Sequence, residues 1–122
     1  MHSIVSLVAR ILLSAIFVTA GVNKISGYAG TQAYMESHGL PGSLLPLVIA
    51  LEVVGGLAVL LGVFSRWAGL ALAGFCLASA AVFHFDFADQ AQATNFMKNV
   101  CMAGGFLLLF ANGSGRYALR PD

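Results

Sequence analysis

The segment from Leu44 to Phe64 constrains the fold of this chain more than any other feature. It reads LLPLVIALEVVGGLAVLLGVF and is apolar throughout, except for Glu52 near its middle. A run of about 20 apolar residues is long enough, as an α-helix, to cross the hydrocarbon core of a bilayer. An ionisable side chain inside such a span is costly, so it indicates a functional site and requires a partner. The interpretation of the remaining chain is therefore a search for the partner of Glu52.

The composition places the whole chain in the lipid bilayer. Its 122 residues form a single predicted domain, residues 1–122, of which 59% are hydrophobic and 9% charged. Soluble domains carry about 25% charged residues, and a small one needs them to cover its large surface. The net charge of +1, without a basic run, gives no reason to expect nucleic-acid binding. The absence of a Lys/Arg cluster in the sequence also removes the usual reason to expect recognition of anionic lipids.

Four apolar segments predict four membrane-spanning helices, at residues 4–23, 44–64, 67–85 and 93–111. Only helices can satisfy the backbone of such isolated spans in lipid. The predicted fold is all-α, an antiparallel bundle of four transmembrane helices with a short interfacial helix between the first and second. Tyr34 and Met35 of that short helix are expected to face lipid.

Basic residues near the ends of the spans predict the orientation. Four arginines are expected on one side of the membrane, and that side should be cytoplasmic, with both termini; they are Arg10, Arg66, Arg116 and Arg120. Arg10 is expected to extend its side chain to this interface. The chain is thus predicted to be a multi-pass membrane protein with both termini on the cytoplasmic side.

This topology brings polar residues of all four spans into the outer half of the membrane. They are Lys24, Glu52, His84, Lys98 and Asn99. Small residues lie one turn away from most of them, which is typical of helix faces that contact other helices. We expect Glu52 to be ionised and paired with Lys24 or Lys98, with Asn99 bridging and His84 exchanging protons. The structural alternative is an ion pair that only fixes helix packing.

No familiar catalytic string is present, and no metal site is predicted. Cys76 and Cys101 lie 25 positions apart in separate apolar segments. That spacing fits neither a disulfide framework nor a zinc site. The double glycines lie within apolar helices, so they indicate close packing and not a phosphate-binding loop.

Six short motifs, in their order and spacing, resemble the DoxX family of small bacterial membrane proteins. They are RILLSAIF at 10–17 followed by AGVNK at 20–24, EVVGG at 52–56, GVFSR at 62–66, HFDF at 84–87, KN at 98–99 with GG at 104–105, and GSGRY at 113–117. The resemblance covers nearly the whole chain. It implies a four-helix inner-membrane protein associated with oxidoreductases and with quinone-dependent reactions.

The resemblance also implies a ligand for the polar cluster. A quinone head group would accept hydrogen bonds from Lys24, Lys98 and Asn99, with Glu52 and His84 as the proton-transferring, catalytic groups. The chain lacks a closely spaced cysteine pair for dithiol chemistry, although Cys76 and Cys101 are placed so that they could meet across the third and fourth spans.

Two other functions remain open at this point. The chain could be a non-catalytic membrane anchor for a soluble oxidoreductase partner, or a pathway for small solutes or protons. The apolar cytoplasmic half of the predicted bundle argues against the pathway. The small-residue faces are also compatible with a homodimer.

Overall fold

The structure, a computed structural model, describes residues 2–122, and over this range it contains five α-helices. They are α1 (His2–Ser26), α2 (Tyr28–Ser37), α3 (Leu45–Leu61), α4 (Ser65–Phe83) and α5 (Gln90–Asn112), with a 3₁₀ turn (Gly42–Leu44) before α3. Each predicted segment corresponds to one helix, and α2 is the predicted short helix. The all-helical prediction is confirmed.

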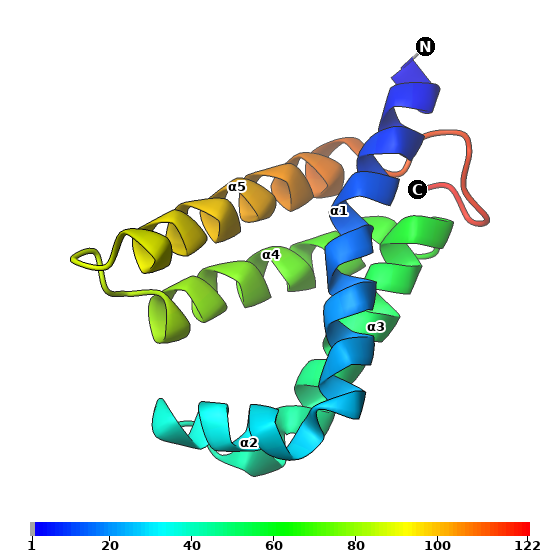
Figure 1. Cartoon of the computed structure of the whole chain (residues 1–122). Coiled ribbons are helices and arrows are strands. Elements are labelled where there is room, and N and C mark those ends of the chain that lie inside the picture. Colours follow the sequence, from blue (N-terminus) through cyan, green and yellow to red (C-terminus); the bar gives the residue numbers. More distant parts are fainter. Residues whose placement is uncertain (1) are drawn as a thin grey trace.

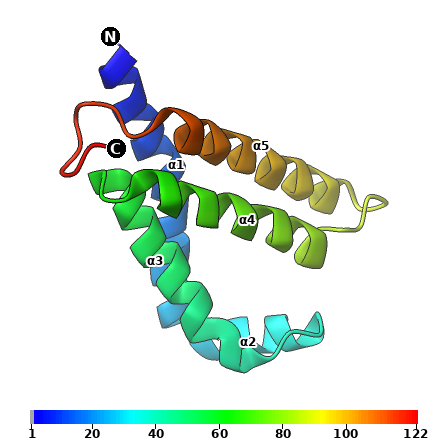
Figure 2. The same ribbon diagram turned by 180° about the vertical axis from the view of Figure 1, so that it is seen from behind.

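The long helices form two antiparallel pairs (Figure 1). Helix α1 packs along α3, and α4 packs along α5. The second pair extends away from the first, and the two pairs meet at a corner where α3 ends and α4 begins (Figures 1 and 2). Both ends of the chain lie near this corner, whereas α2 lies at the opposite end of the α1–α3 pair.

Three helices in the described range are long and apolar enough to cross a membrane, and they occupy Ser3–Ser26, Gly42–Leu61 and Ser65–Phe83. Helix α5 is long enough, but polar side chains such as Gln92, Asn95 and Lys98 interrupt its first half. The structure therefore supports a multi-pass membrane protein with three candidate spans. The predicted four-span bundle is not confirmed, because α5 packs mainly on α4 and the two pairs diverge.

The two pairs share one apolar core near the corner. Phe17 of α1 packs edge to face on Phe106 of α5, with ring centroids 5.4 Å apart. Val59 and Leu72, one each from α3 and α4, are fully buried in the same cluster. The outer surface is also apolar, and Leu12 is 71% exposed. Such a surface is compatible with lipid and not with water.

Helices α1 and α3 approach closely because glycines lie at their contact. A Cβ atom at Gly56 would lie 2.9 Å from Cγ2 of Val18, and one at Gly21 would clash with Cγ2 of Val53. Small residues of this kind allow membrane helices to pack with their backbones near each other. The side chains that follow these glycines along each helix are therefore held within reach of the other helix.

At the corner, Arg10 of α1 links the end of α3 to the segment that follows α5. Its side chain is buried, and Nη1 donates hydrogen bonds to the carbonyl oxygens of Val59 and Leu60, each at 3.1 Å. Nη2 donates to the carbonyl oxygen of Tyr117. The prediction that Arg10 extends to the membrane interface is wrong. The last carbonyls of α3 lack partners within their own helix, and they attract a cation.

Asp122, in the segment that follows α5, forms hydrogen bonds with the N-terminal end of α4. Its Oδ1 accepts hydrogen bonds from Ser65 Oγ at 3.0 Å and from the Ser114 N–H at 3.2 Å. Its Oδ2 accepts from the Arg66 N–H at 3.1 Å. A distant carboxylate thus satisfies the N-terminal donors that local residues leave free.

We predict that Gly21→Ala destabilises the protein by about 1–3 kcal/mol, because the added methyl group must displace Val53. Gly104→Ala is the matched control, since a Cβ there meets no atom within 4 Å. The melting temperatures of the two variants in detergent measure the difference. Equal melting temperatures would contradict the close α1–α3 contact.

We also predict that Asp122 stabilises the corner only above about pH 4. Burial alone would raise the pKa of Asp122, but hydrogen bonds from the Arg66 N–H and from Ser65 and Ser114 hold it below its usual range. A carboxyl group with a lowered folded-state pKa stabilises the fold above its unfolded pKa of about 4 and loses this effect as the pH falls further. The melting-temperature difference between wild type and Asp122→Asn should therefore shrink on acidification. A difference that stays constant with pH would contradict this role.

Candidate functional site

Glu52 forms an ion pair with Lys24. The Lys24 Nζ atom lies 2.7 Å from Glu52 Oε1, and the prediction that Glu52 pairs with Lys24 or Lys98 is confirmed for Lys24. The Glu52 side chain is 2% exposed and that of Lys24 is 28% exposed. The close contact of α1 with α3 at Gly21 accounts for the pair, because Lys24 follows Gly21 by one turn.

The pair borders a cavity of about 420 Å³. All five helices contribute to its wall, and most of the wall is apolar, with Ile16, Phe17, Met35, Val48, Phe75, Val82, Phe83 and Met102 among the lining residues. Sites for small molecules in proteins have volumes of about 300–1,000 Å³ and place a few polar groups in an apolar wall. The cavity has both properties.

His84 and Asn99 also line this cavity. His84 lies at the C-terminal end of α4, and its Nδ1–H donates a hydrogen bond to Gln92 Oε1 at 2.6 Å. Asn99 donates from Nδ2 to the Asn95 carbonyl oxygen, one turn earlier in α5, at 3.0 Å. Four of the five predicted site residues therefore line one cavity, although the hydrogen bonds of Asn99 do not bridge Lys24 and Glu52.

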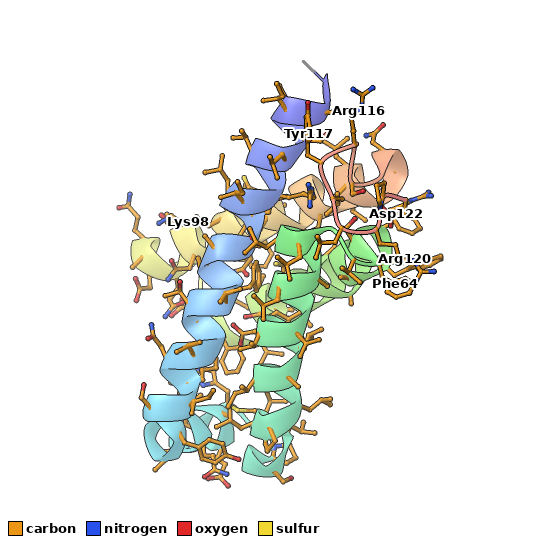
Figure 3. All side chains as sticks on the ribbon, turned by 90° about the vertical axis from the view of Figure 1, so that its right-hand side faces the viewer. Phe64, Lys98, Arg116, Tyr117, Arg120 and Asp122 are labelled. Atoms are coloured by element: carbon orange, nitrogen blue, oxygen red, sulfur yellow. The ribbon has the colours of Figure 1, made fainter. Side chains whose placement is uncertain are left out.

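Lys98 does not join the other four residues. It is exposed, and Figure 3 shows its side chain at the periphery of the structure. Adjacent positions of a helix point in different directions, so Lys98 and Asn99 cannot both face the cavity. The expectation that Lys98 points into the bundle is wrong, and we do not include it in the site.

Helix α2 supplies cavity residues that the sequence analysis did not identify. Met35 is buried in the cavity wall, so the prediction that it faces lipid is wrong. Tyr34 stacks on Phe83 at 5.3 Å, and His38 packs against the same ring at 5.0 Å. Tyr34 and His38 lie four positions apart and thus share a helix face, which was the available signal. The Gln92 partner of His84 was also missed.

The two cysteines do not form a redox pair. Cys76 is buried in the core on α4, whereas Cys101 is exposed on α5, and both thiols are free. The possibility that they meet across these helices is not realised, because Cys76 is buried in the core and Cys101 is exposed. The chemistry available at the cavity therefore comes from its amine, carboxylate, imidazole and amide groups. The amine and amide N–H groups can donate hydrogen bonds to a ligand, and the carboxylate and imidazole groups can exchange protons.

The fold and the site define a helical, multi-pass membrane protein with a buried ion pair beside a ligand-sized cavity. The family model that matches this chain is that of DoxX, over residues 5–85. The chain belongs to the DoxX family. The matched range includes Lys24, Glu52 and His84, and excludes Asn99.

Three curated proteins are similar to the chain. Inner membrane protein YqjF of Escherichia coli (strain K12) is 54% identical over 113 residues, covering 93% of this chain and 87% of YqjF. Inner membrane protein YphA of the same strain is 37% identical over 120 residues, covering 93% and 86%. Putative oxidoreductase CatD of Bacillus subtilis (strain 168) is 33% identical over 68 residues, covering 56% and 51%. No solved structure matches. The chain is thus a multi-pass inner membrane protein of the DoxX family.

We predict that Lys24 and Glu52 are energetically coupled. Lys24→Met should destabilise the protein, because it leaves a buried carboxylate unpaired, whereas the double variant Lys24→Met/Glu52→Gln should recover much of the loss. A coupling energy of about 1–3 kcal/mol is expected from the double-mutant cycle, measured by reversible unfolding.

Lys98→Met serves as the control for this cycle. It removes the same charge from an exposed position and should change the free energy of unfolding by less than about 0.5 kcal/mol. A coupling energy near zero would show that the pair contributes nothing to stability.

Proposed function

We propose that the cavity binds the head group of a lipid-soluble quinone, and that the protein is a membrane component of a quinone-linked oxidoreductase. The observation that carries this proposal is the Lys24–Glu52 ion pair in the wall of a largely apolar cavity of about 420 Å³. The similar CatD protein is named a putative oxidoreductase, which supports the redox assignment.

The residues present fit a quinone. Its flat, apolar ring suits a wall that contains the aromatic rings of Phe17, Tyr34 and Phe75. Its two carbonyl oxygens require donors. Lys24 carries three N–H groups, and the contact with Glu52 engages one of them, so others are free to donate. The Asn99 amide provides a further donor at another part of the wall.

The proposed chemistry assigns a separate task to each polar group. A quinone held in this cavity would supply two-electron redox chemistry that is coupled to the uptake of two protons. Lys24 orients the carbonyl oxygen by donating to it and stabilises negative charge there. Glu52 keeps the lysine charged and accepts or passes on a proton. His84, held at Nδ1 by Gln92, presents Nε2 as the group that exchanges a proton with the ligand.

We further propose four membrane spans, with both termini in the cytoplasm and the cavity in the outer half of the bilayer. Both chain ends lie at the corner, as an even number of spans requires (Figure 1). Arg66, Arg116 and Arg120 lie at this end, which the distribution of basic residues favours as the cytoplasmic side. Helix α5 would cross the membrane beside α4, with its polar first half near the outer surface.

A second candidate, a membrane anchor for a soluble oxidoreductase, is favoured by an aromatic cluster at the α4–α5 connection. Phe85, Phe87 and Phe96 pack edge to face with centroids 5.0–5.9 Å apart, and Phe85 is 67% exposed. Large exposed aromatic side chains of this kind are frequent at protein interfaces.

The quinone proposal is tested by the ligand content of the purified protein. Protein extracted gently, with its surrounding lipid, should contain quinone detectable by mass spectrometry. Glu52→Gln and His84→Ala should lower the quinone content at least about tenfold while the protein remains folded, because each removes a polar group of the cavity wall. Lys98→Gln should retain the wild-type content.

Reproducible absence of quinone from the wild-type protein would contradict the proposal and favour the anchor. In that case Phe87→Ala should weaken association with the oxidoreductase partner, and Glu52→Gln should leave it unchanged. Loss of quinone from Lys98→Gln as well would show that bulk charge, and not the cavity, controls quinone retention.

A further inference from the structure

The fold brings together three arginines that are far apart in the sequence. Arg66 lies at the start of α4, whereas Arg116 and Arg120 lie in the segment after α5. Figure 3 shows Arg116 and Arg120 at the same end of the molecule as Asp122, and the bond from the Arg66 N–H to Asp122 places Arg66 there too. The sequence contains no basic run, yet the structure contains a basic surface.

Exposed aromatic residues surround these arginines. Phe64, Trp67 and Tyr117 are each about half exposed or more. The Arg120 guanidinium lies 4.4 Å from the centroid of the Phe64 ring. The arginine–aromatic patch is defined by these six residues: Phe64, Arg66, Trp67, Arg116, Tyr117 and Arg120.

Carboxylates cancel only part of the charge of this patch. Asp122 is the acidic residue near it, and Asp122 is hydrogen-bonded to Ser65, Ser114 and the Arg66 N–H. Asp86 and Asp89 lie at the α4–α5 connection, at the far end of that pair (Figure 1). The remaining two acidic residues, Glu36 and Glu52, lie on α2 and in the cavity wall. The patch therefore has a net positive charge.

The arginine–aromatic arrangement suits a phosphate group at the edge of the membrane. A guanidinium stacked on an aromatic ring keeps its N–H edge free, and that edge matches two phosphate oxygens at once. Trp and Tyr side chains prefer the depth of the lipid head groups. A free Arg beside an exposed aromatic ring in a membrane protein is therefore positioned at the lipid phosphates.

We propose that the arginine–aromatic patch selectively binds the head groups of anionic phospholipids. The attraction of each basic side chain to an anionic membrane surface corresponds to about a fivefold change in affinity, or about 1 kcal/mol. Three arginines on one surface are thus sufficient to enrich anionic lipids over zwitterionic ones. This inference is independent of the quinone proposal, because the cavity residues play no part in it.

Trp67 provides a direct test, since it is the single tryptophan of the chain and belongs to the patch. The full chain is reconstituted in bilayers of phosphatidylcholine and phosphatidylglycerol. In one sample the phosphatidylglycerol carries brominated acyl chains, and in the other an equal mole fraction of phosphatidylcholine does. Brominated lipid quenches nearby tryptophan fluorescence, so brominated phosphatidylglycerol should quench Trp67 more strongly.

Variants separate specific binding from a general charge effect. Arg120→Gln should lower the selectivity for phosphatidylglycerol by up to about fivefold, and Arg116→Gln/Arg120→Gln should lower it by up to about 25-fold, leaving only the contribution of Arg66. Arg120→Lys should retain only part of the selectivity, because lysine keeps the positive charge but lacks the planar guanidinium group that binds two phosphate oxygens at once. Lys98→Gln, which removes one charge outside the patch, should behave as wild type.

Equal quenching by the two brominated lipids in the wild-type protein would overturn the proposal. Wild-type selectivity in Arg116→Gln/Arg120→Gln would also overturn it, as would an equal loss in Lys98→Gln. Helical circular dichroism, together with the Trp67 emission maximum without brominated lipid, confirms that each variant is folded.

Discussion

An unpaired charge inside an apolar helix is costly, so Glu52 requires a partner of opposite charge. This requirement constrains how the other helices pack. Lys24 satisfies it, but only because α1 and α3 pack closely enough at Gly21 and Gly56 for the two side chains to meet. Helix α1 ends at Ser26, shortly after Lys24, and α2 begins at Tyr28. Helix α2 then folds under α4, and the cavity forms between the two helix pairs.

The ion pair could be predicted from the sequence because few residues in the apolar spans could neutralise a buried carboxylate. Lys24 is near the end of one span and Glu52 is near the middle of the next, so an antiparallel connection places both in the same half of the membrane. Lys98 has a similar predicted depth, and what excluded it was the direction of its side chain. The hydropathy pattern does not show this direction, because residues around it on α5 are of mixed polarity.

The helices were predicted well, but their arrangement was not. Helix α3 is apolar on every side, so no face of it indicates which helix it should contact. Arg10 and Met35 were misplaced for a related reason. Arg10 finds its acceptors on the last turn of α3 and on the segment after α5, and Met35 finds its place against other helices. Contacts between segments that are far apart in the chain leave no pattern in the local sequence.

The segment after α5 also determines the order in which the molecule can be completed. Arg10, in the first helix, and Ser65, at the start of α4, both have partners in this segment, at Tyr117 and Asp122. During synthesis α1, α3 and α4 enter the membrane before these partners exist. A buried arginine and an uncapped helix start must therefore stay solvated by water or lipid head groups until the segment after α5 has been synthesised. The corner therefore becomes complete only after α5 and the segment that follows it have been synthesised.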